Sequence, residues 1–407
     1  MFKLRSNVGP IAELAFFGGS PSFSRPVVVG QPNIPEIDSV LSNFRTVLES
    51  GILSNNGPFV RRFEDEICRI AGVEHCVATC NATVALELTA RALNLTGEVI
   101  VPSFTFIATA HALEWQGLTP VFVDIDPLTH TIDPACIEAA ITPATSAICG
   151  VHLWGNVCDV PALQHIADKN KLELWFDSSH AFAVSIGGTP VGNFGRAEIF
   201  SFHATKFINA FEGGAVVTND AGLAQTLREM RSFGVAEDGQ VANAGINGKM
   251  AEVSAAMGLN ALGCLDRIKS TNRRNFEAYK EYLSACPGVK LRAPVDPEQS
   301  NCQYIVCEID QSETGLSRDQ MLAILEAEGI LAKRYFYPGC HRALPYADKH
   351  ARRGIPLPVT EQLTQSVMVL PTGINVTTED VEVICGLIRY LIESSAQIRD
   401  ELLRNRD

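Results

Sequence analysis

Lys206 lies in a short segment between two apolar stretches of the chain. Residues 198–219 read EIFSFHATKFINAFEGGAVVTN, with strands expected at 198–202 and 215–218. The neighbours of Lys206 are mostly apolar or small, and no Asp, Glu, Lys or Arg follows it before Glu212. Loss of hydration disfavours an ammonium group, so we expect a lowered pKa. A Schiff base with an aldehyde requires a neutral amine, although a lysine that only extends to solvent from a strand end has the same sequence pattern.

Three further side chains near predicted strand ends could recognise a flat heteroaromatic ring. Asp177 ends the apolar run LELWFD, and a carboxylate there can hold the proton of a pyridinium nitrogen. His180 follows three residues later and could contact a phenolic oxygen, while Phe106 in PSFTF could stack on the ring. Each also has an ordinary structural interpretation: a turn cap for Asp177, a packed histidine, and a core phenylalanine.

The segment CNATVAL at 80–86 has the features of a phosphate site. It follows an expected strand and begins a helix, so the N–H groups of Ala82 and Thr83 and the Thr83 hydroxyl could bind a phosphate. Asn81 and Thr83 could equally serve only as helix caps. Taken together, a reactive lysine, a carboxylate for a ring nitrogen, an aromatic face and a phosphate cup are typical of a pyridoxal 5'-phosphate site.

The elements that would position these residues alternate between short apolar strands and helices. Strands are expected at 75–79, 99–101, 120–123, 147–152 and 172–176, and helices at 83–92, 106–116, 134–140 and 160–169. This alternation favours an α/β fold with a mostly parallel sheet and helices on both faces. Ligands in such folds lie beyond the carboxyl ends of the strands, where we expect Asn81, Ser103, Asp124, Asp177 and His203.

The pattern changes after about residue 265. A long helix is expected at 266–283, followed by short Pro-flanked strands and by helices near 317–328 and 378–396. We therefore expect an N-terminal arm (1–30), a large domain (31–265) and a smaller α+β domain (266–407), with the arm able to pack on the small domain.

Composition narrows the class of protein further. The net charge of −13 argues against a general nucleic-acid or anionic-membrane surface. The 12 cysteines form no CxxC pair, and no signal peptide or run of 18 apolar residues is present, so we expect a cytoplasmic protein with reduced thiols. GxGxxG, Walker and GxSxG motifs are absent, and the nine histidines show no zinc-site spacing, so we expect no bound metal.

The order and spacing of these features resemble the DegT/DnrJ/EryC1/StrS family of nucleotide-sugar aminotransferases. The resemblance runs from about residue 51 to 265 and continues more weakly to about 371. It is carried by the segments GPFVRRFEDEI, NATVALEL, VPSFTFIATAHAL, PVFVDIDPLTHTID, VHLWGNVCDV, FDSSHAF, SFHATK, EGGAVVTND and GINGKMAEVSAAMGL. The resemblance implies the type I fold of aspartate aminotransferase, with pyridoxal 5'-phosphate as cofactor.

The resemblance also implies a role for each candidate. Lys206 would bond covalently to the cofactor and later move a proton at the substrate carbon. Asp177 would hold the pyridine nitrogen, His180 would lie near the ring hydroxyl, and Phe106 would stack on the ring. The phosphate would be bound by Ala82, Thr83 and Ser201. Family enzymes are homodimers with shared active sites, which implies that the neighbouring subunit completes the phosphate cup with Asn247 or Lys249.

Several positions depart from the family pattern. Ala82 replaces a glycine, and Gly248-Lys249 replaces Tyr-Arg. Phe207 replaces the asparagine after the lysine, and Phe211 replaces a glycine. We expect Phe207 and Phe211 to lie where the substrate or the neighbouring subunit approaches. The departures therefore concern the identity of the sugar and the contacts between subunits, and they leave the cofactor assignment intact.

The expected function is transfer of an amino group from glutamate to a nucleotide-linked ketosugar. The branch that the sequence resembles aminates C4 of a dTDP-4-keto-6-deoxyhexose. Two alternatives stay open. One is an aminotransferase for a 3-keto nucleotide sugar or an aminocyclitol ketone. The other is a non-catalytic pyridoxal-phosphate-binding regulator, although such proteins usually carry an added DNA-binding or membrane segment, and the sequence shows neither.

Overall fold

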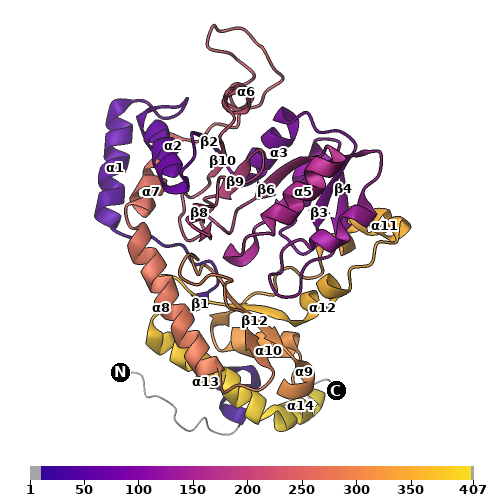
Figure 1. Ribbon diagram of the computed structural model, residues 1–407. Coiled ribbons are helices and arrows are strands. Elements are labelled where there is room, and N and C mark those ends of the chain that lie inside the picture. Colours follow the sequence, from indigo (N-terminus) through magenta and orange to yellow (C-terminus); the bar gives the residue numbers. More distant parts are fainter. Residues whose placement is uncertain (1–10, 405–407) are drawn as a thin grey trace.

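The computed structural model describes residues 11–404, so residues 1–10 of the expected arm and residues 405–407 lie outside the described residues. A seven-stranded sheet in the order β2-β10-β9-β6-β5-β3-β4 forms the centre of the larger part (Figure 1). Its strands are β2 (His75–Thr79), β3 (Glu98–Pro102), β4 (Thr119–Val123), β5 (Thr145–Val151), β6 (Glu173–Asp177), β9 (Glu198–Ser201) and β10 (Gly214–Thr218). Only β10 runs antiparallel to its neighbours within this sheet, which confirms the predicted α/β class with a mostly parallel sheet.

Helices cover both faces of this sheet. They are α1 (Ile37–Ser50), α2 (Pro58–Ala71), α3 (Ala82–Ala92), α4 (Ala108–Trp115), α5 (Val160–Asn170), α6 (Ala221–Arg231) and α7 (Glu252–Leu262). Successive side chains of a strand point to opposite faces. In β10, Ala215 and Val217 therefore pack with α2 and α7, whereas Val216 packs with α3 and α6. Burial on both faces explains why these strands read as continuous apolar runs.

One expected helix is absent. Residues 134–140 form two short 3₁₀ turns, Pro134–Cys136 and Glu138–Ala140, instead of an α-helix. The Asp133 side chain accepts a hydrogen bond from the Ala135 N–H, and Ile141 is already extended. The N–H groups of Cys136 and Ala140 bond to the carbonyls three residues back, those of Asp133 and Ile137, which is the pattern of 3₁₀ turns and not of an α-helix.

The smaller part is built on a three-stranded antiparallel sheet of β11 (Val289–Leu291), β12 (Ile305–Ile309) and β14 (Val367–Leu370). It packs against α8 (Leu265–Leu283), α10 (Arg318–Ala327) and α13 (Thr378–Glu393), and Figure 1 shows α8 descending from the large sheet to α13. This part also contains α9 (Gln311–Thr314) and α14 (Ser395–Arg404), while β7 (Ser185–Ile186) and β8 (Thr189–Pro190) form a short separate hairpin before β9. We propose the domain boundary near residue 265, where α8 begins.

The N-terminal arm, as far as it is described, packs on this smaller part. Strand β1 (Val27–Val28) pairs in parallel with β13 (Ile330–Leu331). Leu14 is buried in the same apolar core as Ile330 and Tyr279. The chain thus passes from the smaller part to the larger part near residue 30 and back near residue 265. Two separate connections therefore join the two parts.

Part of the C-terminal region returns to the large sheet. Helix α11 (Leu344–Arg353) lies beside β4 (Figure 1), where Tyr346 packs against Phe122. The buried carboxylate of Asp124, just after β4, accepts hydrogen bonds from the N–H groups of Val359 and Thr360 at the start of α12 (Pro358–Ser366). The region 266–407 is therefore not wholly separate from the large sheet. Within residues 11–404, no helix combines the length and the apolar character needed to cross a membrane.

Candidate active site

Lys206 lies at the edge where β9 and β6 end, in the loop that joins β9 to β10. Its backbone N–H donates to the His203 carbonyl at 2.8 Å, which forms a tight turn. The next residue fixes the loop to two distant segments: the Phe207 N–H donates to Gln303 Oε1 at 3.3 Å, and its carbonyl accepts from Asn33 Nδ2 at 2.9 Å. The loop is therefore held between the segment that follows the N-terminal arm and the residues just before β12.

The Lys206 side chain is half-buried at this edge of the sheet. Its Nζ lies 3.3 Å from the Tyr304 hydroxyl, immediately before β12. Burial lowers the pKa of Lys206 to about 8, against the opposing effect of the Asp177 carboxylate. At that pKa roughly a tenth of the amine is neutral at pH 7, far more than for an ordinary lysine. The predicted lowering of the pKa is thus supported by the geometry.

Asp177 is the last residue of β6, and its carboxylate is fixed by two donors. Thr109 Oγ1 donates to Asp177 Oδ2 at 2.7 Å, and the Ser179 N–H donates to Oδ1 at 3.1 Å. The residue is 5% exposed. The bond from Ser179 shows that the turn-capping interpretation also applies. The cap engages one oxygen only, so it orients the carboxylate without excluding a ligand.

His180 is buried between Trp154 and Tyr304. Its Nδ1 faces the Trp154 backbone N–H at 3.4 Å, and its Nε2 lies 3.1 Å from the Tyr304 hydroxyl. The indole of Trp154 stacks on the imidazole at 5.6 Å between ring centroids. Burial, and then the charge of Lys206, hold the pKa of His180 well below its usual value. His180 is therefore a neutral imidazole, and it is linked to Lys206 through the Tyr304 hydroxyl.

Phe106 is not a core residue. Its side chain is 57% exposed, and its carbonyl accepts a hydrogen bond from the N–H of Thr109, the residue that contacts Asp177. The Phe106 ring is thus accessible at the surface, one helical turn before Thr109. Its stacking role stays a prediction.

The start of α3 has the expected features of an anion site. Asn81 caps the helix by accepting from the Val84 N–H at 2.9 Å, while the N–H groups of Ala82 and Thr83, as the first two of the helix, have no acceptor within it. Gly214 pairs with Ser201 across the sheet, and a Cβ on Gly214 would lie 2.5 Å from the Ala82 nitrogen. Glycine at 214 therefore lets β10 bring Ser201 close to the helix start.

Asn247 and Lys249 lie beside that helix start through contacts within their own chain. Lys249 pairs with Thr79 at the end of β2, and the Cys80 N–H donates to the Gly248 carbonyl at 2.8 Å. The segment therefore lies at the edge of its own chain's sheet, because the chain returns to β2 after α6. Lys249 Nζ donates to Asn247 Oδ1 at 2.6 Å.

A hairpin precedes these two residues and protrudes from the body of the protein beyond α6 (Figure 1). It is closed by pairing of Ser232 with Asn247, and Lys249 Nζ lies 4.3 Å from the centre of the Phe233 ring. The Asn247 side chain is exposed. The structure thus leaves the Asn247 side chain exposed and the Lys249 side chain half-buried in a single chain, beside the end of β2.

Phe207 and Phe211, the two phenylalanines that depart from the family pattern, lie in different environments. Phe207 is 4% exposed and packs against Phe182 in the core beneath the loop, so the expectation that it lies where the substrate or the neighbouring subunit approaches is wrong. An apolar side chain after Lys206 turns inward because the loop covers the α2–α7 side of the sheet. Phe211 is exposed, with a φ of 61° that explains why a glycine would suit the position.

The residues that sequence reasoning missed are Thr109, Trp154 and Tyr304. Tyr304 comes from the small part of the fold, and nothing local in the sequence marks it. Among residues 11–404, no group of three or more His, Cys, Asp and Glu residues is arranged to hold a metal ion. The site instead presents an amine, a fixed carboxylate, an exposed aromatic ring and free helix N–H groups. These features fit a ligand that carries an aldehyde, a ring nitrogen and a phosphate.

Comparison with known proteins agrees with this chemistry. The sequence model of the DegT/DnrJ/EryC1/StrS aminotransferase family matches residues 36–389. The chain is 35% identical to the dTDP-4-amino-4,6-dideoxy-D-glucose transaminase of Shigella dysenteriae. The alignment of 369 residues covers 90% of this chain and 99% of that relative. The crystal structure of DesI in the presence of its TDP-sugar product is 46% identical, with a TM-score of 0.91 over 98% of this chain and 100% of that one. The aminotransferase PseC of Helicobacter pylori, involved in pseudoaminic acid biosynthesis, is 28% identical with a TM-score of 0.84, covering 91% and 100% of the two chains.

Proposed function

Because the chain belongs to the DegT/DnrJ/EryC1/StrS aminotransferase family, we propose that it transfers an amino group from glutamate to a nucleotide-linked ketosugar. The proposed position is C4 of a dTDP-4-keto-6-deoxyhexose, with pyridoxal 5'-phosphate as cofactor on the type I fold of aspartate aminotransferase. The carrying observation is the half-buried amine of Lys206, whose pKa burial lowers to about 8, near the fixed carboxylate of Asp177. The names of the Shigella enzyme and of DesI support the choice of sugar.

The proposal assigns a role to each residue of the site. When bound, the cofactor supplies an aldehyde and an electron-accepting ring. Lys206 would hold it and, as a free amine, take and return a proton at the substrate carbon. Asp177, oriented by Thr109, would keep the ring nitrogen protonated, and His180 would contact the ring hydroxyl. Phe106 would cover the ring face, and the phosphate would be bound by Ala82, Thr83 and Ser201.

The proposal is tested with a panel of ketosugars. Purified protein, pyridoxal 5'-phosphate and glutamate are incubated with a dTDP-4-keto-6-deoxyhexose, its 3-keto isomer or an aminocyclitol ketone, and products are read by mass spectrometry and NMR. Only the 4-keto sugar should gain nitrogen, with one 2-oxoglutarate formed per amine. Amination at C3 or of the cyclitol would replace the substrate assignment. Cofactor binding without turnover of any ketone or of glutamate would favour the regulator.

We also propose a homodimer in which Asn247 and Lys249 complete the phosphate site of the neighbouring subunit. Both residues lie at the base of the protruding hairpin, and Asn247 is exposed in the single chain. The hairpin carries the exposed apolar side chains of Phe233, Val241 and Ile246, which a partner surface would cover. Two-fold symmetric dimers are also the commonest assembly.

Complementation tests this sharing of sites. A Lys206→Ala chain is mixed with a chain carrying Asn247→Ala and Lys249→Ala, after each parent is shown to be impaired. A mixed dimer collects both lesions in one site and leaves the other intact. Subunit exchange should therefore restore roughly a quarter of wild-type activity on random pairing. No recovery despite proven exchange, or an active monomer, would assign the two residues to the site of their own chain.

A further inference from the structure

Tyr304 links the small part of the fold to the Lys206 amine. Its hydroxyl lies 3.3 Å from Lys206 Nζ and 3.1 Å from His180 Nε2. Burial raises the pKa of the Tyr304 phenol well above its usual value, so the hydroxyl keeps its proton. A phenol between two nitrogens has one proton to give, and the direction in which it points determines which form of Lys206 it stabilises.

The neighbours of His180 fix that direction. The backbone N–H of Trp154 points at His180 Nδ1, which must therefore be the acceptor nitrogen of the ring. In a neutral imidazole the other nitrogen then carries the proton, so His180 Nε2 donates to the Tyr304 oxygen. The Tyr304 proton is left to point at Lys206, and a neutral amine can accept it whereas an ammonium cannot.

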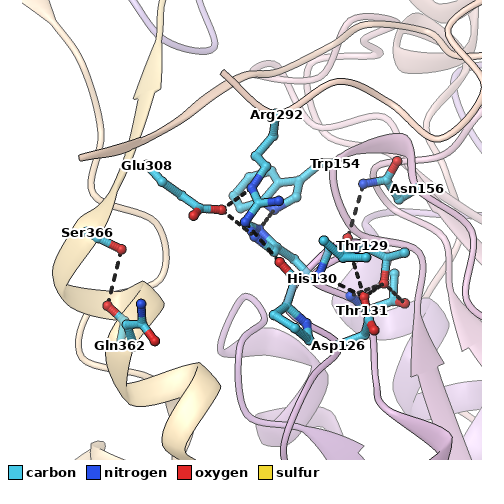
Figure 2. A network of polar contacts seen from close by, with 12 residues as sticks. Asp126, Thr129, His130, Thr131, Trp154, Asn156, Arg292, Glu308, Gln362 and Ser366 are labelled. Carbon is cyan, nitrogen blue, oxygen red and sulfur yellow. Dashed lines mark hydrogen bonds and ion pairs between the residues drawn. The ribbon is translucent and has the colours of Figure 1, made fainter. Parts of the chain in front are cut away.

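A second set of contacts holds Trp154 in place (Figure 2). Its indole Nε1, which can only donate, lies 3.3 Å from Nδ1 of the buried His130. His130 Nε2 must then carry the proton, and it lies 2.9 Å from Glu308 Oε1 on β12. Arg292 pairs with the same carboxylate and donates to the Pro127 carbonyl at 2.9 Å. The Trp154 indole N–H donates toward His130, whereas its backbone N–H donates toward His180, so the contacts with His130 and Glu308 hold Trp154 in place and the backbone N–H sets the direction at His180.

We propose that the Tyr304 hydroxyl donates a hydrogen bond to the neutral Lys206 amine, and that the backbone N–H of Trp154, acting through His180, fixes this direction. Tyr304 is thus a positioning residue for the reactive amine, supplied by the small part of the fold. The inference rests on the proposed function, since it assigns Lys206 as the reacting group. The other titratable groups that face Lys206 are Asp177 and His180, with Tyr335 behind Tyr304 and with His203 of the same loop turned toward Thr205.

The sign of one pKa change tests the proposal without the cofactor. Full-length protein freed of pyridoxal 5'-phosphate is labelled with trace acetic anhydride from pH 6 to 11, and modification of Lys206 is followed by peptide mass spectrometry. The exposed Lys290 in the same sample is the reference. Tyr304→Phe removes a donor to the neutral amine, so the midpoint for Lys206 should rise by about one pH unit, the scale of one hydrogen bond. Labelling at pH 7 should fall about tenfold.

Two further variants and a folding measurement show whether a change in the Lys206 midpoint comes from the Tyr304 hydroxyl. Tyr282→Phe, on the outer side of α8, should leave the Lys206 midpoint unchanged. Thermal unfolding shows whether Tyr304→Phe folds, and if it does not, His180→Asn, which removes the donor that orients Tyr304, should raise the midpoint instead. A midpoint that falls or stays the same would overturn the proposal, because Tyr304 would then accept from the ammonium or not interact. An ordinary lysine midpoint in the wild type would instead contradict the proposed function.

Discussion

Lys206→Ala is expected to abolish transamination, with a loss of roughly 10⁴-fold or more, because the change removes both the group that holds the cofactor and the base that moves the proton. Release of 2-oxoglutarate from glutamate in the presence of the ketosugar measures the loss. Borohydride should no longer fix pyridoxal 5'-phosphate to the chain. The cofactor can still bind through its phosphate and ring contacts, so loss of turnover should exceed loss of binding.

The chain offers a demanding control for this variant. Burial also lowers the pKa of Lys269 on α8, where the ammonium donates to the Ala183 carbonyl at 2.9 Å. A lowered pKa alone therefore does not mark the reactive lysine; the position beside Asp177 does. Lys269→Met should retain most of the turnover. Substantial turnover in Lys206→Ala, or a comparable loss in Lys269→Met, would contradict the assignment of the reactive amine.

Asp177→Asn has the second largest expected effect, a loss in turnover of roughly 10³-fold, while the protein stays folded and binds the cofactor. An amide has almost the same shape and can still accept from the Ser179 N–H, but it carries no charge to keep a ring nitrogen protonated. The variant should also lower the midpoint for acetylation of Lys206, because the Asp177 carboxylate raises the pKa of that amine.

Asp159→Asn is the matched control, since the Asp159 carboxylate caps α5 by accepting from the Ala162 N–H. If Asp177 were only a cap, both variants would keep near-normal turnover. Turnover of Asp177→Asn within a few-fold of wild type, at normal cofactor occupancy, would show that the carboxylate serves the turn and not the ring.

The parallel sheet and the candidate strand ends were predictable because burial on both faces leaves a clear sequence pattern. Residues 75–79 were predicted as a strand with the observed bounds of β2, and Asp177 was placed at a strand end. The carboxyl ends of parallel strands meet at one edge, so Lys206, Asp177 and His180 could be grouped before any contact was known.

The other strand-end residues show where such reasoning fails. Ser103 and Asp124 have the same residue types and positions as a ligand-binding group. Ser103 instead bonds to His341 and Asp124 caps α12, so both hold the returning C-terminal segment. Nothing in a strand distinguishes an end that faces a ligand from one that faces another part of the chain. Tyr304 was missed for the same reason, since its contact depends on how the two parts of the fold pack.

The most direct test is to locate the covalent bond. Wild-type protein loaded with pyridoxal 5'-phosphate is reduced with borohydride, digested, and mapped by mass spectrometry. The peptide that carries Lys206 should bear the cofactor in nearly every chain, and excess glutamate added before reduction should remove the label by converting the cofactor to its amine form. Label on another lysine, or on none while the cofactor stays bound, would contradict the assignment of this site.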